Sequence, residues 1–243
     1  MNMCCRFLLV SIAGFLLLGC SLSDDAPKIS VYAASFDFNV SAEGWMADFA
    51  DFPAVEGDSI PYEFSFSHTN LPPYLGAQKG LMLSCSNYSD DLFMFMKKKI
   101  TGLIPNTVYS IVFEVELATN ARKNATEPSA PASGSVFLKA GASAVEPASK
   151  VESNEYVLNI DKGAPNQNGA HAIFLGDVAT PPSYNGNEYV IMTRSNDLTS
   201  GPEFIARSND AGEIWIFVGT DSLFEDPMTV YFTKVSLVFS APY

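Results

Sequence analysis

The chain has 243 residues, 47% of them hydrophobic and 17% charged, a composition that supports a sizeable folded core and excludes a disordered chain. Its formal net charge is −13, with 27 acidic residues against 14 basic ones. A chain this acidic lacks the basic surface that neutralises phosphates, so we expect no nucleic-acid partner. Anionic lipid would also repel it.

The first residues carry the pattern of an export signal. Arg6 precedes an apolar run, residues 7–18, that is too short to cross a bilayer comfortably. The run closes on Leu17-Leu18-Gly19-Cys20, which resembles the lipobox of bacterial lipoproteins. That resemblance implies that residues 1–19 are a signal peptide and that Cys20 becomes the N-terminus. It also implies that acyl chains such as palmitate, attached to Cys20, anchor an exported protein to the membrane of the cell envelope.

Residues 20–34 follow as the lipidated cysteine and a polar tether. In enteric bacteria an aspartate after the cysteine marks retention in the inner membrane, and this chain has Ser21 there, so the outer membrane is the preferred location. Cys4 and Cys5 lie in the signal peptide, which leaves Cys85 as the single free thiol of the mature chain. We expect no intramolecular disulfide, and Cys85 is expected in the core as a small hydrophobic residue.

Beyond the tether, period-two alternation recurs and no amphipathic helix of convincing length is found. In residues 109–117 the odd positions are all apolar and the even positions are mostly polar. Similar runs occur at 62–68, 92–96, 135–140, 156–160, 170–175, 189–194, 213–218 and 229–239. About ten short strands separated by turn sequences predict an all-β fold, an antiparallel β-sandwich. Residues 35–243 are expected to form one domain, with a long polar loop at 118–134.

Three motifs resemble one group of proteins, the carbohydrate-binding modules with the galactose-binding-like jelly-roll fold. They are Phe36-Asp37-Phe38-Asn39 followed by Glu43-Gly44-Trp45, the turn Thr101-Gly102-Leu103-Ile104-Pro105-Asn106-Thr107-Val108-Tyr109, and the ending Val230-Tyr231-Phe232-Thr233-Lys234-Val235-Ser236-Leu237. The resemblance implies a jelly-roll β-sandwich and a polysaccharide or other glycan as the ligand.

The same resemblance implies a structural calcium ion, held by the early acidic residue and by an aspartate of the last strand. Asp37 matches the first of these positions. At the second, the chain has Thr233-Lys234, which removes a carboxylate ligand and adds a positive charge. Calcium needs six to eight oxygen ligands, so Asp37 would need support from backbone carbonyls. The alternative is that Asp37 caps a turn.

Carbohydrate binding uses an aromatic face against the apolar side of a sugar, with amide and charged groups bonding the hydroxyls. The candidate aromatic residues are those in loop-like contexts: Trp45, Tyr74, Tyr88 and Tyr184. The candidate polar residues come from two stretches: Asn166, Gln167, Asn168, His171 and Asn185. For each aromatic residue, packing within the fold is the alternative role. Trp215 lies in a dense apolar strand and is expected in the core.

The sequence carries no Gly-x-Ser-x-Gly elbow, HExxH helix or phosphate-binding glycine loop. A non-catalytic role is therefore expected, with carbohydrate as the leading ligand class. The alternative is a structural or protein-interaction lipoprotein of the cell envelope, which would show a broad apolar patch rimmed by charge. A third possibility is a glycan-acting hydrolase, which would need two close carboxylates or a histidine beside a serine.

Overall fold

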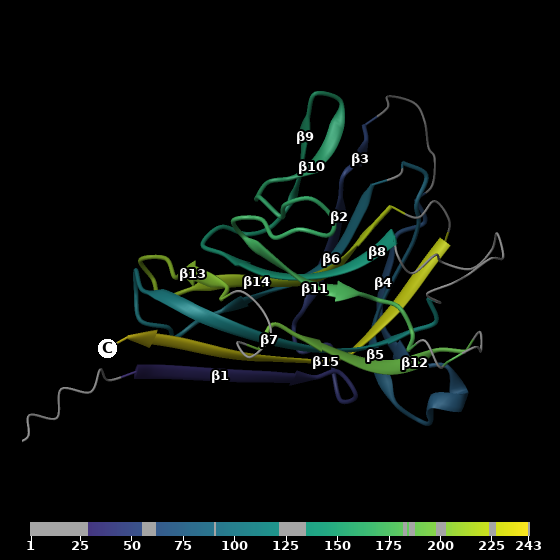
Figure 1. The fold of residues 1–243 in the computed structure, drawn as a ribbon, viewed down its shortest axis with the longest axis horizontal. Coiled ribbons are helices and arrows are strands. Elements are labelled where there is room, and N and C mark those ends of the chain that lie inside the picture. Colours follow the sequence, from purple (N-terminus) through teal and green to yellow (C-terminus); the bar gives the residue numbers. More distant parts are fainter. Residues whose placement is uncertain are drawn as a thin grey trace, which may run out of the picture.

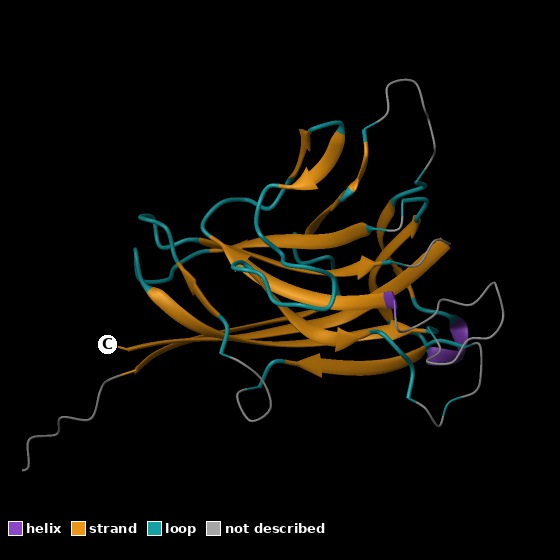
Figure 2. Cartoon of the chain, turned by 45° about the horizontal axis from the view of Figure 1, so that its top comes forward, coloured by secondary structure: helices purple, strands orange, loops and turns teal. Residues whose placement is uncertain are grey.

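The computed structural model describes residues 29–54, 62–89, 91–121, 135–181, 184, 188–197, 203–223 and 227–242. Within these ranges strands dominate, and a short 3-10 helix, η1, spans Pro73–Leu75. Figure 2 shows this predominance of strands, in orange. In the same ranges, no helix has the length and apolar character needed to cross a membrane. The expected signal peptide and the lipidation site Cys20 lie outside the described residues.

The larger of two main sheets has seven strands in the order β12-β7-β15-β5-β4, with β1 also paired to β15 and β13 to β7. The strands are β1 Ile29–Asp37, β4 Ser65–Asn70, β5 Lys79–Ser86, β7 Val108–Thr119, β12 Val190–Ser195, β13 Ile205–Arg207 and β15 Pro227–Pro242. The pairings are antiparallel. Strand β15 is long enough to pair with β5 through its first half and with β1 through its second.

The second main sheet has five strands in the order β11-β8-β14-β6-β2, and a small third sheet has the order β3-β10-β9. The strands of the five-stranded sheet are β2 Met46–Ala50, β6 Leu92–Ile100, β8 Val136–Ser143, β11 Ala172–Asp177 and β14 Ile214–Ser222. Those of the small sheet are β3 Phe52–Pro53, β9 Ser149–Glu152 and β10 Glu155–Leu158. In Figure 1 the larger sheet is the lower layer, the five-stranded sheet lies above it, and β9 and β10 project from the top.

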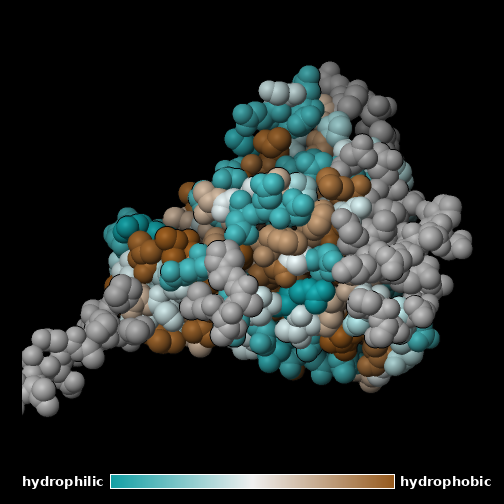
Figure 3. Space-filling model, viewed as in Figure 1, coloured by the Kyte–Doolittle hydropathy of each residue, from teal (hydrophilic) through white to brown (hydrophobic). Residues whose placement is uncertain are grey.

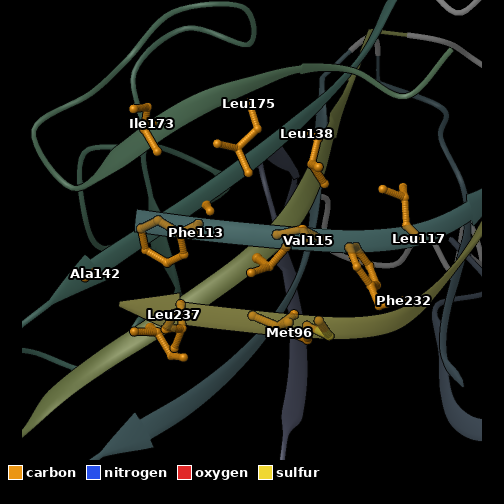
Figure 4. Close-up of a cluster of buried hydrophobic side chains, with 14 of the residues drawn as sticks. Met96, Phe113, Val115, Leu117, Leu138, Ala142, Ile173, Leu175, Phe232 and Leu237 are labelled. Atoms are coloured by element: carbon orange, nitrogen blue, oxygen red, sulfur yellow. The ribbon is translucent and has the colours of Figure 1, made fainter. Parts of the chain in front are cut away.

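The main core lies between the two layers, where side chains from both sheets meet (Figure 4). The odd positions of β7 are buried as its alternation predicts, including Phe113, Val115 and Leu117 at 0% exposure. Leu138 of β8 and Met96 of β6 belong to the same buried cluster. Antiparallel layers packed in this way confirm the expected all-β sandwich.

Two features of the fold differ from the expectations. Residues 29–34, expected in the tether, are the first part of β1, because they pair with the end of β15. The described residues hold fifteen strands instead of about ten. The additional strands include short ones such as β3 and β13, which have too few residues to show alternation. Tertiary pairing, and not local pattern, makes these segments extended.

Cys85 lies in the core, as expected. It is 2% exposed, and its thiol donates a hydrogen bond to the carbonyl of Tyr62 at 2.9 Å. Burial raises the pKa of Cys85 to about 12, because desolvation disfavours the thiolate. The thiol is therefore a packing group and an unreactive one.

Candidate ligand-binding cleft

A cleft with a volume of about 420 Å³ lies where the small sheet meets the five-stranded sheet. Four segments line it: the β2–β3 junction at 51–53, the loop before β6 at Ser89 and Asp91, strand β10, and the loop after β10 at 160–163. Figure 3 shows hydrophilic residues gathered over the projecting hairpin of β9 and β10 above this region. Segments far apart in the sequence therefore build one concave site.

The alternation of β14 explains why the cleft lies on the outer side of the sandwich. Ile216 and Val218 belong to the core between the sheets, whereas Phe217 belongs to a second apolar cluster with Phe93 and Phe95. Side chains of a strand alternate between faces, so Asp221 shares the outer face with Phe217. Leu158 at the end of β10 and Ile160 in the loop after it belong to the same cluster and cover this face, and Asp221 is fully buried.

Three carboxylates and a lysine meet at this place. Asp51, Asp91 and Asp221 each offer one carboxylate oxygen, and these oxygens lie within 4.8 Å of one another. The ammonium of Lys162 donates to Oδ2 of Asp221 at 2.7 Å and lies 3.0 Å from Oδ2 of Asp51. Burial raises the pKa of Asp221 to about 7, against the attraction of Lys162, and burial also raises the pKa of Asp91. Close carboxylates in a dry site disfavour a second negative charge.

A second lysine, Lys139 on β8, is completely buried beneath the loop after β10. Its ammonium donates to three backbone carbonyls of that loop, those of Lys162 at 2.5 Å, Ala164 at 2.7 Å and Gln167 at 2.8 Å. It also lies 4.0 Å from Oδ2 of Asp221. The loop is thus folded around one buried positive charge, and this arrangement fixes the wall of the cleft formed by residues 160–163.

An aromatic column reaches the cleft through Phe52. Phe64, Phe49, Phe52 and Tyr156 stack in this order, with ring centroids 4.5, 4.6 and 4.6 Å apart and interplanar angles of 19° or less. Phe52 lines the cleft, and Tyr156 ends the column with 37% of its surface exposed. Tyr156 and Phe52 are direct partners across β10 and β3, so the small sheet presents them together.

No protein-family model matches the sequence, and no curated protein matches it either. Among solved structures, the fold is similar to a carbohydrate-binding module described for specific mannan recognition, TmCBM27. The identity is 11%, the TM-score is 0.39, and the match covers 87% of this chain and 98% of that one. A putative sugar-binding protein from Bacteroides thetaiotaomicron matches with 9% identity and a TM-score of 0.38, over 85% of this chain and 91% of that one.

A xylan-binding domain of carbohydrate-binding module family 22 also matches, with 13% identity and a TM-score of 0.36, over 86% of this chain and 93% of that one. These neighbours are carbohydrate-binding modules or sugar-binding proteins. Identities and TM-scores this low do not assign a ligand to the present chain.

Neither tryptophan lies where the sequence indicated, which was a ligand-binding loop for Trp45 and the core for Trp215. Trp45 is 3% exposed, and Phe36 and Phe38 pack edge-on against it at 5.5 and 5.8 Å. It is therefore a core residue and cannot present a ring face to a sugar. The expectation that Trp45 binds the ligand is wrong. Trp215 is half-buried on the outer face of β14, with the Lys99 ammonium 5.4 Å from its ring centroid. This half-buried position outside the core clusters corrects the expected place of Trp215 in the core.

Asp37, the expected calcium ligand, is exposed and caps a turn. Its Oδ1 accepts the backbone N–H of Asn39 at 2.9 Å, and its partner across the sheet is Lys234. The nearby carboxylate of Glu116 accepts the Thr233 hydroxyl at 2.6 Å. The carboxylates that gather at ligand distance within the described part of the chain are those of the cleft, and Asp37 is not one of them.

The predicted amide-rich stretch lies in the loop that Lys139 holds. Asn168 uses its side-chain oxygen to accept the N–H of Phe174 at 2.8 Å, and Nδ1 of His171 accepts the N–H of Asp161 at 3.3 Å. Gln167 contributes its backbone carbonyl to Lys139. Asn166 lies in the same loop. These residues therefore shape the loop next to the cleft and are not among the residues that line it.

The predicted tyrosines lie at separate places. Tyr88 is 52% exposed and directly precedes Ser89 of the cleft. Tyr74 is 50% exposed on η1, outside the cleft lining, and its hydroxyl accepts the N–H of Tyr189 at 2.5 Å. Tyr184 is half-buried, and Asn185 lies outside the described residues. Of the predicted aromatic residues, Tyr88 is the one next to the cleft.

Sequence reasoning missed the groups that build the cleft, namely Asp51, Asp91, Asp221, Lys162 and the pair Phe52 and Tyr156. Two signals could have pointed to part of the cluster. Lys139 interrupts the apolar strand β8, and Asp221 follows the apolar run of β14 without an intervening turn. A charged residue inside an apolar strand indicates a paired buried charge. The partners of these two charged residues come from distant segments, so the local sequence pattern could not identify them.

Proposed function

We propose that this protein binds carbohydrate, without catalysis, in the cleft beside β10. The observation that carries the proposal is the aromatic column of Phe64, Phe49, Phe52 and Tyr156, whose member Phe52 lines a cleft together with carboxylates and Lys162. Aromatic rings accept the apolar face of a sugar ring, and charged groups bond its hydroxyls.

The dimensions and polarity of the cleft support a small part of a glycan as the occupant. A volume of about 420 Å³ falls within the range of roughly 300–1,000 Å³ typical of small-molecule sites. Glu155 and Asp161 add carboxylate acceptors for hydroxyl groups, and Ser89 adds a hydroxyl. Such a mixture of short polar groups beside one aromatic ring suits a neutral polyhydroxylated ligand better than an apolar one.

The geometry favours binding over hydrolysis. A glycosidase needs one carboxyl group to protonate the leaving oxygen and a second one to attack or to activate water. Here Asp221 is fully buried, and both oxygens of Asp51 face donors, Oδ1 the N–H of Leu158 at 3.3 Å and Oδ2 the Lys162 ammonium at 3.0 Å. These carboxylates are held as part of the structure.

Replacing Tyr156 with alanine tests the proposal. We expect glycan binding to weaken by about tenfold or more, since the change removes an exposed ring whose stacking is worth roughly 0.5–1.5 kcal/mol beyond its buried area. The measurement is a glycan-array screen with the protein produced from Ser21 onward, followed by isothermal titration with each glycan retained.

Tyr74→Ala is the matched control, because Tyr74 is similarly exposed but lies on η1 and takes no part in the aromatic column. We expect this variant to bind like the wild type, and both variants to melt near the wild-type temperature. Loss of binding in Tyr74→Ala with retention in Tyr156→Ala would place the site elsewhere. An array without any retained glycan would reject the proposed function.

We also propose that the protein is exported and anchored by acyl chains at Cys20, with the outer membrane as its location. The lipobox-like sequence ending at Cys20 supports this. Strand β1 begins at Ile29, so residues 21–28 would be the whole connection to the folded domain. At about 3.3–3.6 Å per residue, these eight residues would reach at most about 29 Å, which would keep the start of β1 close to the membrane.

Metabolic labelling with a palmitate analogue tests the anchor. We expect the full-length chain to incorporate the label and to fractionate with membranes. Cys20→Ala is expected to lose both properties, because the thiol is the attachment point. Cys85→Ala serves as the control and should keep the label, since Cys85 is buried in the folded domain. Unchanged labelling of Cys20→Ala would refute the anchor.

A further inference from the structure

We propose that Asp51, Asp91 and Asp221 form a binding site for calcium next to the cleft. The inference goes beyond glycan binding, although Asp51 and Asp91 also line the cleft. It also places the ion away from Asp37, the position that the sequence resemblance implied.

The three carboxylates converge on one point. One oxygen of each lies within 4.8 Å of the others. Asp221 is 0% exposed and its Oδ1 has no hydrogen-bond partner, and Oδ1 of Asp91 is likewise buried without one. A carboxylate oxygen removed from water and left without a donor is costly, so buried ones are nearly always paired or bound to a cation. The unpartnered Asp221 oxygen therefore points to a missing positive partner.

Lys162 contacts two of these carboxylates. It donates to Oδ2 of Asp221 at 2.7 Å and lies 3.0 Å from Oδ2 of Asp51, and the N–H of Leu158 donates to Oδ1 of Asp51 at 3.3 Å. Groups that bond ligating carboxylates from behind orient them toward a metal. In this arrangement Lys162 holds Asp221 through Oδ2 and leaves Oδ1 of Asp221 without a donor.

The charges and ligand types favour a hard divalent cation. With all three carboxylates ionised, as a bound cation would favour, their charge exceeds that of the ammonium groups of Lys162 and Lys139 by one, and Glu155 and Asp161 line the adjoining cleft. Oxygen-only ligands suit calcium and magnesium, in contrast to the nitrogen and sulfur ligands preferred by transition metals. Calcium tolerates irregular geometry and takes additional water ligands, which the cleft can supply from the side of Asp51 and Asp91.

The test begins with protein treated with a chelator and dialysed, without any glycan present. We expect one calcium ion per chain by isothermal titration. At calcium concentrations about a hundredfold above the dissociation constant, we expect the melting temperature to rise by roughly 5–10 °C. Magnesium is expected to give a smaller rise. No shift with either ion would overturn the site and would indicate a proton shared by Asp91 and Asp221 in its place.

Three variants locate the ion. Asp221→Asn and Asp91→Asn are each expected to lose most of the calcium-induced shift, and Asp37→Asn is the matched control that should keep it. If Asp221→Asn does not fold, Asp91→Asn decides, because Asp91 is only half-buried. A shift that persists in Asp91→Asn, or that disappears in Asp37→Asn, would overturn the proposal. Glycan binding by chelated protein is measured separately, so failure of one proposal leaves the other testable.

Discussion

Trp45→Ala is expected to lower the free energy of unfolding by about 3–5 kcal/mol, the usual cost of truncating a buried tryptophan. The indole is 3% exposed and lies edge-on between Phe36 of β1 and Phe38, so its removal opens a cavity at the edge of the main core. A chain of this size should then melt roughly 6–20 °C lower. Thermal and urea unfolding, followed by circular dichroism, measure the change.

Trp45→Phe separates ring packing from the indole N–H. The Nε1 atom of Trp45 is buried without a hydrogen-bond partner, so a phenylalanine removes an unsatisfied donor while keeping an aromatic ring. We expect it to cost much less than alanine. If Trp45→Ala melted like the wild type and instead abolished glycan binding, Trp45 would be a ligand platform and its place in the core would be wrong.

Lys139→Met is expected to be the second large effect, lowering the free energy of unfolding by about 3–5 kcal/mol. Methionine fills a similar volume but leaves the carbonyls of Lys162, Ala164 and Gln167 without their shared donor in a buried place. It also removes the positive charge 4.0 Å from the buried carboxylate of Asp221. Both losses leave polar groups unpaired, which costs more than the pair itself contributes.

The loop after β10 should respond first. We expect faster hydrogen exchange of its amides in Lys139→Met, followed by a lower melting temperature of the whole domain. Lys150→Met is the matched control, because the Lys150–Glu152 pair is exposed on the projecting hairpin at 51% and 61% side-chain exposure. Removal of such a surface pair changes stability by at most about 1 kcal/mol. Equal stability of the two variants would contradict the structural role of Lys139.

The loop after β10 contributes both to the stability of the domain and to the cleft. Its inner side is held by Lys139, and its residues Asp161, Lys162 and Gly163 form one wall of the cleft. Gly163 has a φ of +71°, and a Cβ there would approach the backbone of Asn168 to 2.6 Å. The loop can therefore close on itself only with glycine at this position. Stability and ligand affinity should change together when the loop is disturbed.

Much of the strand framework could be predicted from local pattern. The alternation in residues 109–117 predicted β7, and the runs at 92–96 and 213–218 predicted the first halves of β6 and β14. Each of these strands has many residues with one face in the core, so the pattern has room to show itself. Strand β2, in contrast, is short and lacks alternation, and its position follows from pairing with β6.

The amino-acid sequence by itself determined that the chain is an all-β sandwich with a thiol buried in its core, because hydrophobic alternation depends only on neighbours along the chain. Only the tertiary structure decided where the polar groups go. Asp51, Asp91 and Asp221 are separated by up to 170 positions, and strand pairing brings them together around Lys162. It also placed Trp45 in the core, since burial depends on which strands pack against a residue and not on its local sequence.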